Sequence, residues 1–95
     1  LLNTPFTKDG VFSWRLSLQK HSNSADTSRD PYRSRLVLLE NGSPLLMSHS
    51  LHDEIRQIGM GRYSHWDGNL YFSASDNTDP NTNGREYKIV FSKEI

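Results

Sequence analysis

The chain has 95 residues, with eleven basic side chains, eleven acidic side chains and no cysteine. A chain of this length builds one hydrophobic core, so residues 1–95 are expected to form a single domain. The opposite charges cancel and are scattered along the sequence, which argues against the basic surface that a nucleic-acid-binding protein needs. The lack of cysteine excludes disulfides, cysteine-ligated zinc and thiol nucleophiles, so stability has to come from packing.

No segment of the sequence predicts insertion into a membrane. The longest uninterrupted apolar run, Leu36–Leu39, has four residues, whereas a membrane-spanning helix needs about 18 or more. The chain starts at Leu1 without a charged and then apolar leader, which favours a domain cut from a larger protein. The composition fits a cytoplasmic and a cell-surface location equally well.

The first confident strand pattern covers Val11–Gln19. Four apolar residues alternate there with polar ones: Phe12, Trp14, Leu16 and Leu18. A period of two places this apolar set on one face of a sheet. The following segment, Lys20–Ser34, has no periodicity and is rich in Ser, Asp and Asn, which predicts a long exposed loop.

A tight hairpin is predicted next. Arg35–Glu40 is a short and nearly continuous apolar run, as expected of a strand covered on both faces. Asn41-Gly42 tolerates the positive φ angles of a type I′ turn, so Leu36–Glu40 should pair with Ser43–Met47. Pro44 favours an edge position for the second strand.

One short helix is expected at Leu51–Ile58, where apolar residues follow helical spacing. Ser50 precedes it as a candidate N-cap, and Gly59 follows it as a terminator. The C-terminal third then predicts a strand or an ordered loop at Arg62–Trp66.

Two further strands are predicted at Asn69–Ser73 and Arg85–Ser92, and Pro5–Thr7 is a candidate edge strand. Strands joined by turns, without repeated helical crossovers, are typical of antiparallel folds. The predicted fold class is therefore all-β, a small antiparallel β-sandwich or barrel-like domain with one short helix.

The segment 74–84 is a long loop of carboxylates, carboxamides and hydroxyls, and loops of that length are mostly functional or disordered. Sugars present hydroxyls at their edges and weakly polar faces, so a receptor needs flat rings and planar polar groups. Tyr63 and Trp66 are the candidate stacking platforms and His65 a candidate donor or acceptor. The candidate rim is Asp76, Asn77, Asp79, Asn81, Asn83 and Arg85. The alternative leaves the two rings as packing residues and Arg85 as a structural counterion of the acidic loop.

Residues 79–84 match the first half of a calcium-binding loop, D-x-[DN]-x-[DN]-G. The twelfth position is Val90 rather than the Glu of an EF-hand, so this is not an EF-hand. A shorter calcium clamp from Asp79, Asn81 and Asn83 remains a candidate, with no other metal or cofactor expected. The alternative is a series of Asx turns.

Enzymatic chemistry has weaker signals. His65 with Asp76 or Asp79 is a conceivable acid–base pair. His49, His52 and their acidic neighbours would form a zinc site only if the segments converged. Metalloprotease and serine-hydrolase motifs are missing from the sequence.

Four runs resemble an accessory segment of bacterial proteins that make or modify surface polysaccharides: G-R-Y-S-H-W at 61–66, F-S-A-S-D-N at 72–77, D-P at 79–80 and N-G-R at 83–85. In those proteins the segment accompanies glycosyltransferase or related domains. The resemblance implies carbohydrate and the other domains of a parent protein as partners. The expected function is a non-catalytic carbohydrate-binding accessory domain. The alternatives are a protein-interaction or structural module that positions a neighbouring enzyme domain, and a small glycan-acting enzyme.

Overall fold

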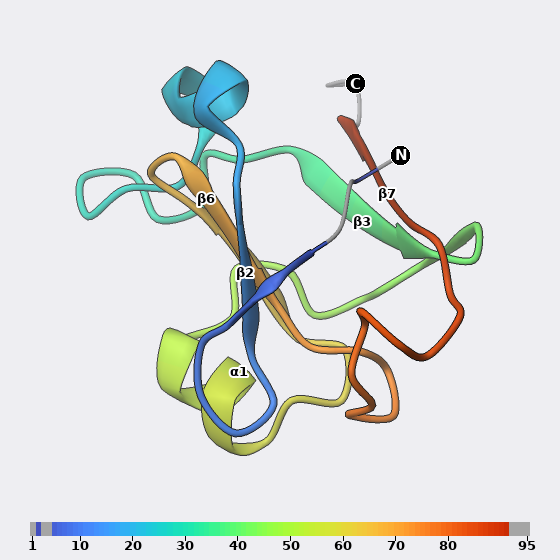
Figure 1. Ribbon diagram of the computed structural model, residues 1–95. Helices are drawn as coiled ribbons and strands as arrows, with labels where there is room; N and C mark the ends of the chain where they lie inside the picture. Colours follow the sequence, from blue (N-terminus) through green and yellow to red (C-terminus); the bar gives the residue numbers. More distant parts are fainter. Residues whose placement is uncertain (1, 3–4, 92–95) are drawn as a thin grey trace.

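The computed structural model describes residues 2 and 5–91, which fold into two antiparallel sheets (Figure 1). The elements in chain order are β1 (Thr7–Lys8), β2 (Trp14–Ser17), the 3-10 helix η1 (Gln19–Ser24), β3 (Leu36–Glu40), β4 (Ser43–Pro44), α1 (His52–Gln57), β5 (Tyr63–Trp66), β6 (Asn69–Phe72) and β7 (Tyr87–Phe91). The larger sheet has the order β1-β2-β6-β5 and the smaller one β4-β3-β7. The predicted small all-β sandwich is confirmed.

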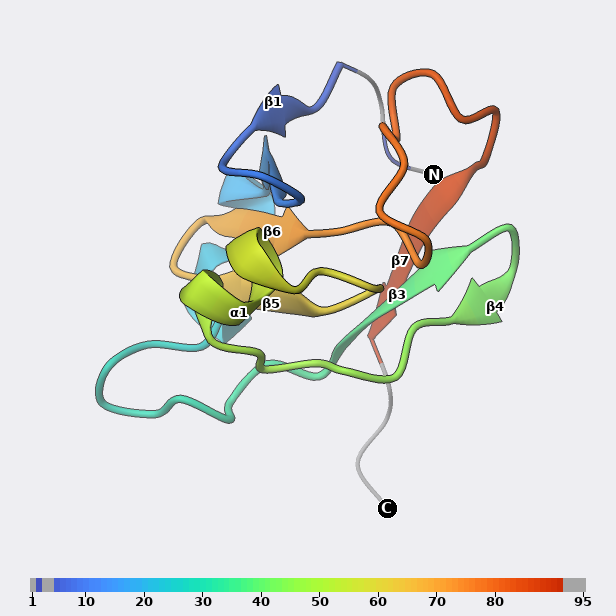
Figure 2. The same ribbon diagram turned by 90° about the horizontal axis from the view of Figure 1, so that it is seen from below.

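The core lies between the two sheets, which Figure 2 shows from below. Its buried side chains come from both sheets and from the segment before β1: Phe6, Trp14, Leu18, Leu36, Leu38, Tyr63, Leu70, Phe72, Ala74 and Tyr87. The Phe6 ring meets the rings of Phe72 and Tyr87 edge to face, with centroids 5.0 and 5.9 Å apart. Such edge-to-face pairs add stability beyond the apolar area that they bury.

The β5–β6 hairpin divides its side chains between two faces. Tyr63 pairs with Phe72, and Trp66 pairs with Asn69 at the closed end of the hairpin. Because successive strand residues point to opposite faces, Tyr63 and His65 lie on the core side and Trp66 on the outer side. Helix α1 packs against β5 and β6.

The predicted hairpin turn is confirmed, since Asn41 and Gly42 have φ values of 49° and 83°. Its second strand is shorter than expected and ends at Pro44. The predicted helix begins one residue late, at His52, and Ser50 does not cap it. The Ser50 hydroxyl instead donates to the carbonyl of Met47, at 2.6 Å.

Other boundaries also differ from the prediction. The strand expected at Val11–Gln19 covers only Trp14–Ser17, because Phe12 belongs to a bend whose N–H donates to the carbonyl of Arg56. The loop expected from Lys20 begins inside η1. The edge strand lies at Thr7–Lys8 rather than Pro5–Thr7.

The last strand starts at Tyr87, two residues later than predicted, and its predicted end at Ser92 is outside the described residues. In the part of the chain that the structure describes, no helix has the length and apolar character to cross a lipid bilayer.

Candidate functional site

The polar loop predicted as the rim of a sugar site lies at the far end of β6 from Trp66. Trp66 pairs with the first residue of β6, whereas residues 73–84 leave β6 beyond its last residue, Phe72. Four strand residues, each rising about 3.3 Å, separate the two ends. Figure 1 shows the hairpin turn at upper left and the loop, in orange, at lower right. The structure therefore does not place the loop beside the indole.

Two asparagines of the loop bind backbone groups of other segments. Asn77 accepts a hydrogen bond from the N–H of Met60 at 2.7 Å and donates to the carbonyl of Ile58 at 3.1 Å. Asn81 accepts from the N–H of Phe6 at 2.7 Å and donates to the carbonyl of the same residue at 3.1 Å. Each carboxamide thus pairs with the backbone as a neighbouring strand would. We call Asn77 and Asn81 the asparagine clasps.

The charged residues of the loop form a network around Glu40. Arg85 donates two hydrogen bonds to Asp76, at 2.8 and 2.7 Å, and lies 3.5 Å from a Glu40 oxygen. The hydroxyls of Ser75 and Tyr87 donate to Glu40 at 2.6 and 2.7 Å. Burial acts to raise the pKa of Glu40, but these hydrogen bonds and the Arg85 charge outweigh it and lower the pKa. The Arg85 guanidinium also holds the pKa of Asp76 well below its usual range.

The candidate calcium ligands are engaged within the loop. Asp79 accepts from the N–H of Asn81 at 2.8 Å, and Asn83 accepts from the N–H of Arg85 at 3.0 Å. These are the Asx turns that the sequence left as the alternative. Across residues 2 and 5–91, no group of three or more His, Cys, Asp or Glu side chains is placed to hold a metal ion. Calcium binding stays a prediction.

Two of the predicted ligand residues lie in the interior. Tyr63 is 2% exposed, and its hydroxyl donates to the carbonyl of Leu36 at 3.5 Å. His65 is also 2% exposed, and its Nδ1 lies 2.6 Å from the Ser34 hydroxyl oxygen. Burial raises the pKa of Tyr63 and lowers that of His65. The expectation of an open Tyr63 ring is corrected, because the strand turns this residue toward the core.

The conceivable acid–base pairs of His65 with Asp76 or Asp79 are not formed. Besides burial, the charges that shift the pKa of His65 are those of Asp26 and His21. Asp76 is bound to the guanidinium of the loop, and Asp79 to a backbone N–H of its own turn.

Trp66 remains half-buried on the outer face of β5 and lines a pocket of about 460 Å³, which we call the Trp66 pocket. Its walls come from the loop before β3, the segment leading into α1, and β5. The lining residues are Asp26, Pro31, Tyr32, His49, Ser50, Leu51, His52, Asp53, Ser64 and Trp66. Four rings lie here in two pairs: His52 stands edge-on to Trp66, with centroids 5.7 Å apart, and Tyr32 stands edge-on to His49 at 5.3 Å.

An aspartate–histidine pair lies in the wall of this pocket. Asp26 is 1% exposed; one carboxylate oxygen accepts from the N–H of Ser34 at 2.7 Å, and the other lies 2.5 Å from Nδ1 of His49. Since a carboxylate only accepts, Nδ1 of His49 carries a proton, and Nε2 is the ring nitrogen left for a ligand. Within the described residues, Nε2 of His49 has neither a hydrogen-bond partner nor full burial. The backbone of His49 has a φ of 56°, in the left-handed region.

His52 contributes a second imidazole to the pocket. Its ring stacks on Tyr71 at 4.3 Å, with a tilt of 35°. Its Nε2 is buried and has no hydrogen-bond partner among the described residues. Burial, together with the charge of Arg56, lowers the pKa of His52, so the neutral ring is favoured.

Local sequence patterns contained only weak signals for these residues. Asp26 and Tyr32 lie in the segment predicted as an exposed loop, and only tertiary contacts bring Asp26 to His49, 23 positions later. For Tyr63 and Trp66 the alternation of side chains along a strand was a usable signal. Because these two residues are three positions apart on one strand, they face opposite sides of the sheet.

Comparison of the chain with protein-family models, with curated proteins and with solved structures finds no match. Function therefore has to be inferred from the geometry of the domain.

Proposed function

We propose that this domain binds carbohydrate without catalysis and that the ligand occupies the Trp66 pocket. The observation that carries this proposal is the partly exposed indole of Trp66, which lies beside further rings in one hollow. The volume of about 460 Å³ falls within the range of small-molecule sites, about 300–1,000 Å³. A flat ring packs against the C–H face of a sugar.

The pocket also supplies polar groups for sugar hydroxyls. Nε2 of His49 is left for a hydrogen bond with a sugar hydroxyl, which can both donate and accept, and Asp26 holds the orientation of the ring. Asp53 and Ser50 line the same pocket. An apolar wall with a few convergent polar groups is the usual composition of a site that recognises a small ligand.

The resemblance of segments within 61–85 to an accessory stretch of bacterial surface-polysaccharide proteins supports the same class of ligand. Under this proposal the domain supplies binding to a neighbouring catalytic domain. Affinity for one sugar unit is weak and is raised by multivalency or by the tethered partner.

Calorimetric titration and a glycan array test the proposal with wild-type protein and the Trp66→Ala variant. We expect the variant to lose at least about ten-fold in affinity, since an aromatic anchor dominates a small interface. Leu46→Ala is the matched control, because Leu46 is 86% exposed and does not line the pocket. Unchanged binding by a folded Trp66→Ala variant, or no binding by wild type to any glycan, would contradict the proposal.

A protein-interaction module is the second candidate. It is favoured by large apolar side chains that stand in solvent: Leu46, Met47, Leu51 and Met60 are 86, 46, 68 and 55% exposed. Under this function Leu46→Glu weakens binding to a neighbouring domain of the parent protein and leaves glycan binding unchanged.

A further inference from the structure

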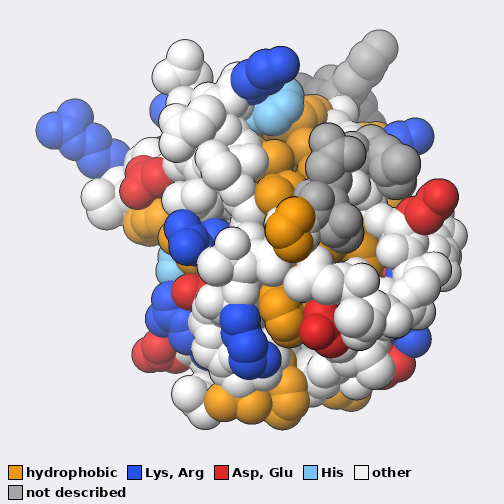
Figure 3. Space-filling view, viewed as in Figure 1, with side chains coloured by type: hydrophobic (Ala, Val, Ile, Leu, Met, Phe, Trp, Pro, Cys, Tyr) orange, Lys and Arg blue, Asp and Glu red, His pale blue; other side chains and the backbone are white. Residues whose placement is uncertain are grey.

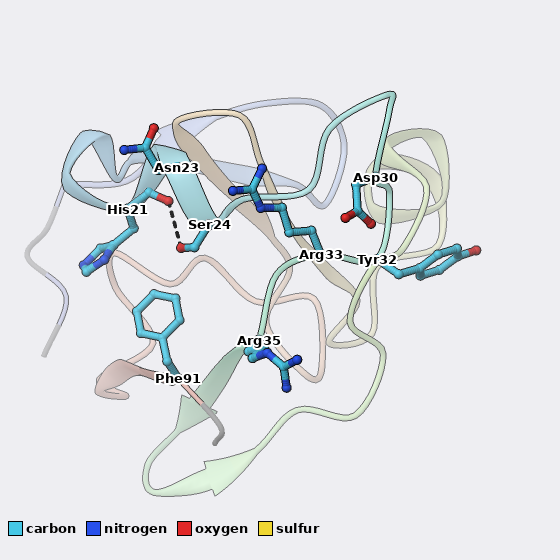
Figure 4. A pocket seen from close by; sticks show the side chains of 8 residues that line it. All are labelled: His21, Asn23, Ser24, Asp30, Tyr32, Arg33, Arg35 and Phe91. Carbon is cyan, nitrogen blue, oxygen red and sulfur yellow. Dashed lines mark hydrogen bonds between the residues drawn. The ribbon is translucent and has the colours of Figure 1, made fainter. Parts of the chain in front are cut away.

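A second pocket adjoins the Trp66 pocket on the other side of Tyr32. Its volume is about 650 Å³. Figure 4 shows the lining residues, which come from η1, the loop before β3, and β7: His21, Asn23, Ser24, Asp30, Tyr32, Arg33, Arg35 and Phe91. We call this the Arg33 pocket. Tyr32 is the residue that lines both pockets.

Tyr32 and Arg33 extend in different directions from the same loop. The phenol ring of Tyr32 is 75% exposed and points away from His21 and Phe91 in Figure 4, consistent with its edge-on contact with His49. Arg33 extends instead toward the helical turn that carries Asn23 and Ser24. One extended ligand that crosses Tyr32 can therefore contact both pockets.

The segment 19–35, which supplies seven of the eight residues that line the Arg33 pocket, is more basic than the chain as a whole. The chain as a whole is neutral, but residues 19–35 carry four basic side chains, Lys20, Arg29, Arg33 and Arg35, against the two acidic side chains Asp26 and Asp30. Asp26 is buried and bonded to His49. By contrast, Figure 3 shows basic and acidic side chains interspersed over the visible face.

The guanidinium of Arg33 is exposed and has no hydrogen bond or ion pair with any residue that the structure describes. A planar guanidinium in this state presents several donors that match a carboxylate or a sulfate with two parallel hydrogen bonds. Asp30 is the one carboxylate among the lining residues, and its backbone carbonyl, not its carboxylate, accepts from the N–H of Arg33.

We propose that the ligand is an anionic glycan, with a sugar ring against Trp66 and an anionic substituent bound by Arg33. This inference rests on the proposed carbohydrate function and specifies the class of ligand. The anionic substituent is a carboxylate or a sulfate. The Asn23 carboxamide offers further donors at the edge of the pocket, whereas the Ser24 hydroxyl donates to the carbonyl of His21 at 3.1 Å.

Calorimetric titration with three polymers tests the inference. Dextran and dextran sulfate share a neutral backbone and differ in charge, and polygalacturonate supplies carboxylates. We expect tighter binding of at least one anionic polymer than of dextran. Arg33→Gln should weaken binding of that polymer about five-fold, the range for one exposed charge pair. Arg29→Gln is the matched control, since Arg29 is in the same loop and lines neither pocket.

Each outcome decides between the two proposals. Equal binding of dextran and the anionic polymers, lost in Trp66→Ala and unchanged in Arg33→Gln, would overturn the anionic ligand and keep carbohydrate binding. No binding of any of the three polymers would overturn the anionic ligand, and the glycan array would then decide on carbohydrate binding. Anionic binding that Arg29→Gln and Arg33→Gln weaken equally, and that Trp66→Ala leaves intact, would show ion exchange on the surface and would also overturn both.

Discussion

The polar loop at 74–84 and the Trp66 pocket contain similar kinds of side chains and use them differently. In the loop, the asparagine clasps and the Arg85–Asp76 pair direct their polar atoms at the domain itself. In the pocket, one ring nitrogen of His49 is bound to Asp26 and the other is left for a ligand. A polar group with an internal partner has little to gain from a ligand, so the polar atoms left without a partner make the Trp66 pocket the better candidate site.

The largest effect on stability is expected for Tyr63, which the sequence analysis grouped with Trp66 as a stacking platform. Tyr63→Ala should lower the free energy of unfolding by about 3–5 kcal/mol, as for other buried aromatic residues. Urea denaturation measures it. The control Tyr63→Phe keeps the ring and removes the hydroxyl with its interactions with the backbone of Leu36 and Leu38 and the side chain of Ser48, so it should cost less than Tyr63→Ala. A Tyr63→Ala variant with wild-type stability and reduced glycan affinity would contradict this prediction and support Tyr63 as a residue on which the sugar stacks.

Substitution of an asparagine clasp should have the next largest effect on stability. Asn81→Ala leaves both backbone groups of Phe6 without their partner and should cost about 1–3 kcal/mol of unfolding free energy, with glycan affinity unchanged. Thr82→Ala is the neighbouring control, since its hydroxyl makes only a 3.5 Å contact with the carbonyl of Asp79. If Asn81→Ala lost glycan affinity and kept wild-type stability, the loop at 74–84 would be the ligand site instead.

A pH series probes the buried imidazoles. The folded-state pKa of His65 lies below the ordinary 6.5, chiefly through burial, with Asp26 opposing and His21 assisting. The unfolded chain therefore takes up protons first, and the free energy of unfolding should fall as the pH drops below about 6.5. The same sign applies to His52. Urea denaturation at about pH 7.5 and 5.5 measures the fall, and His65→Gln should make it smaller. A ring resonance of His65 that titrates above 6.5 would contradict the prediction.

The smallest effect on stability is expected for the ion pair between Arg85 and Asp76, which faces solvent. Asp76→Asn weakens the two hydrogen bonds from Arg85 but leaves Glu40 beside the guanidinium. Exposed ion pairs contribute little. The thermal midpoint should therefore fall by less than it does in Asn81→Ala. A larger fall would show that the network around Glu40 depends on Asp76.

Local patterns predicted the elements of this fold more successfully than their ends. The type I′ turn at Asn41-Gly42 follows from backbone preference alone, and the alternation in β6 from a buried face. The N-terminus of α1 was misjudged because Ser50 bonds to Met47, a choice that depends on the preceding turn. Capping and strand ends are settled by such short-range competition.

The site was less predictable than the fold. The polar composition of residues 74–84 predicted a ligand site there. The hydrogen bonds between Asn81 and Phe6 span 75 positions, so the local sequence could not predict that Asn81 is already occupied. Asp26 and His49 likewise meet only after the chain has folded. Tyr63 and Trp66 are the instructive case, because their spacing on one strand already assigned them to opposite faces.

The clasp at Asn81 has a chemical consequence. An amide offers both a donor and an acceptor to the backbone of Phe6, whereas a carboxylate offers acceptors only. Deamidation of this one side chain would set a negative oxygen against the carbonyl of Phe6. The segment before β1 would then keep only the hydrogen bond from the N–H of Phe6, so spontaneous deamidation at Asn81 would weaken the attachment of this segment to the sandwich.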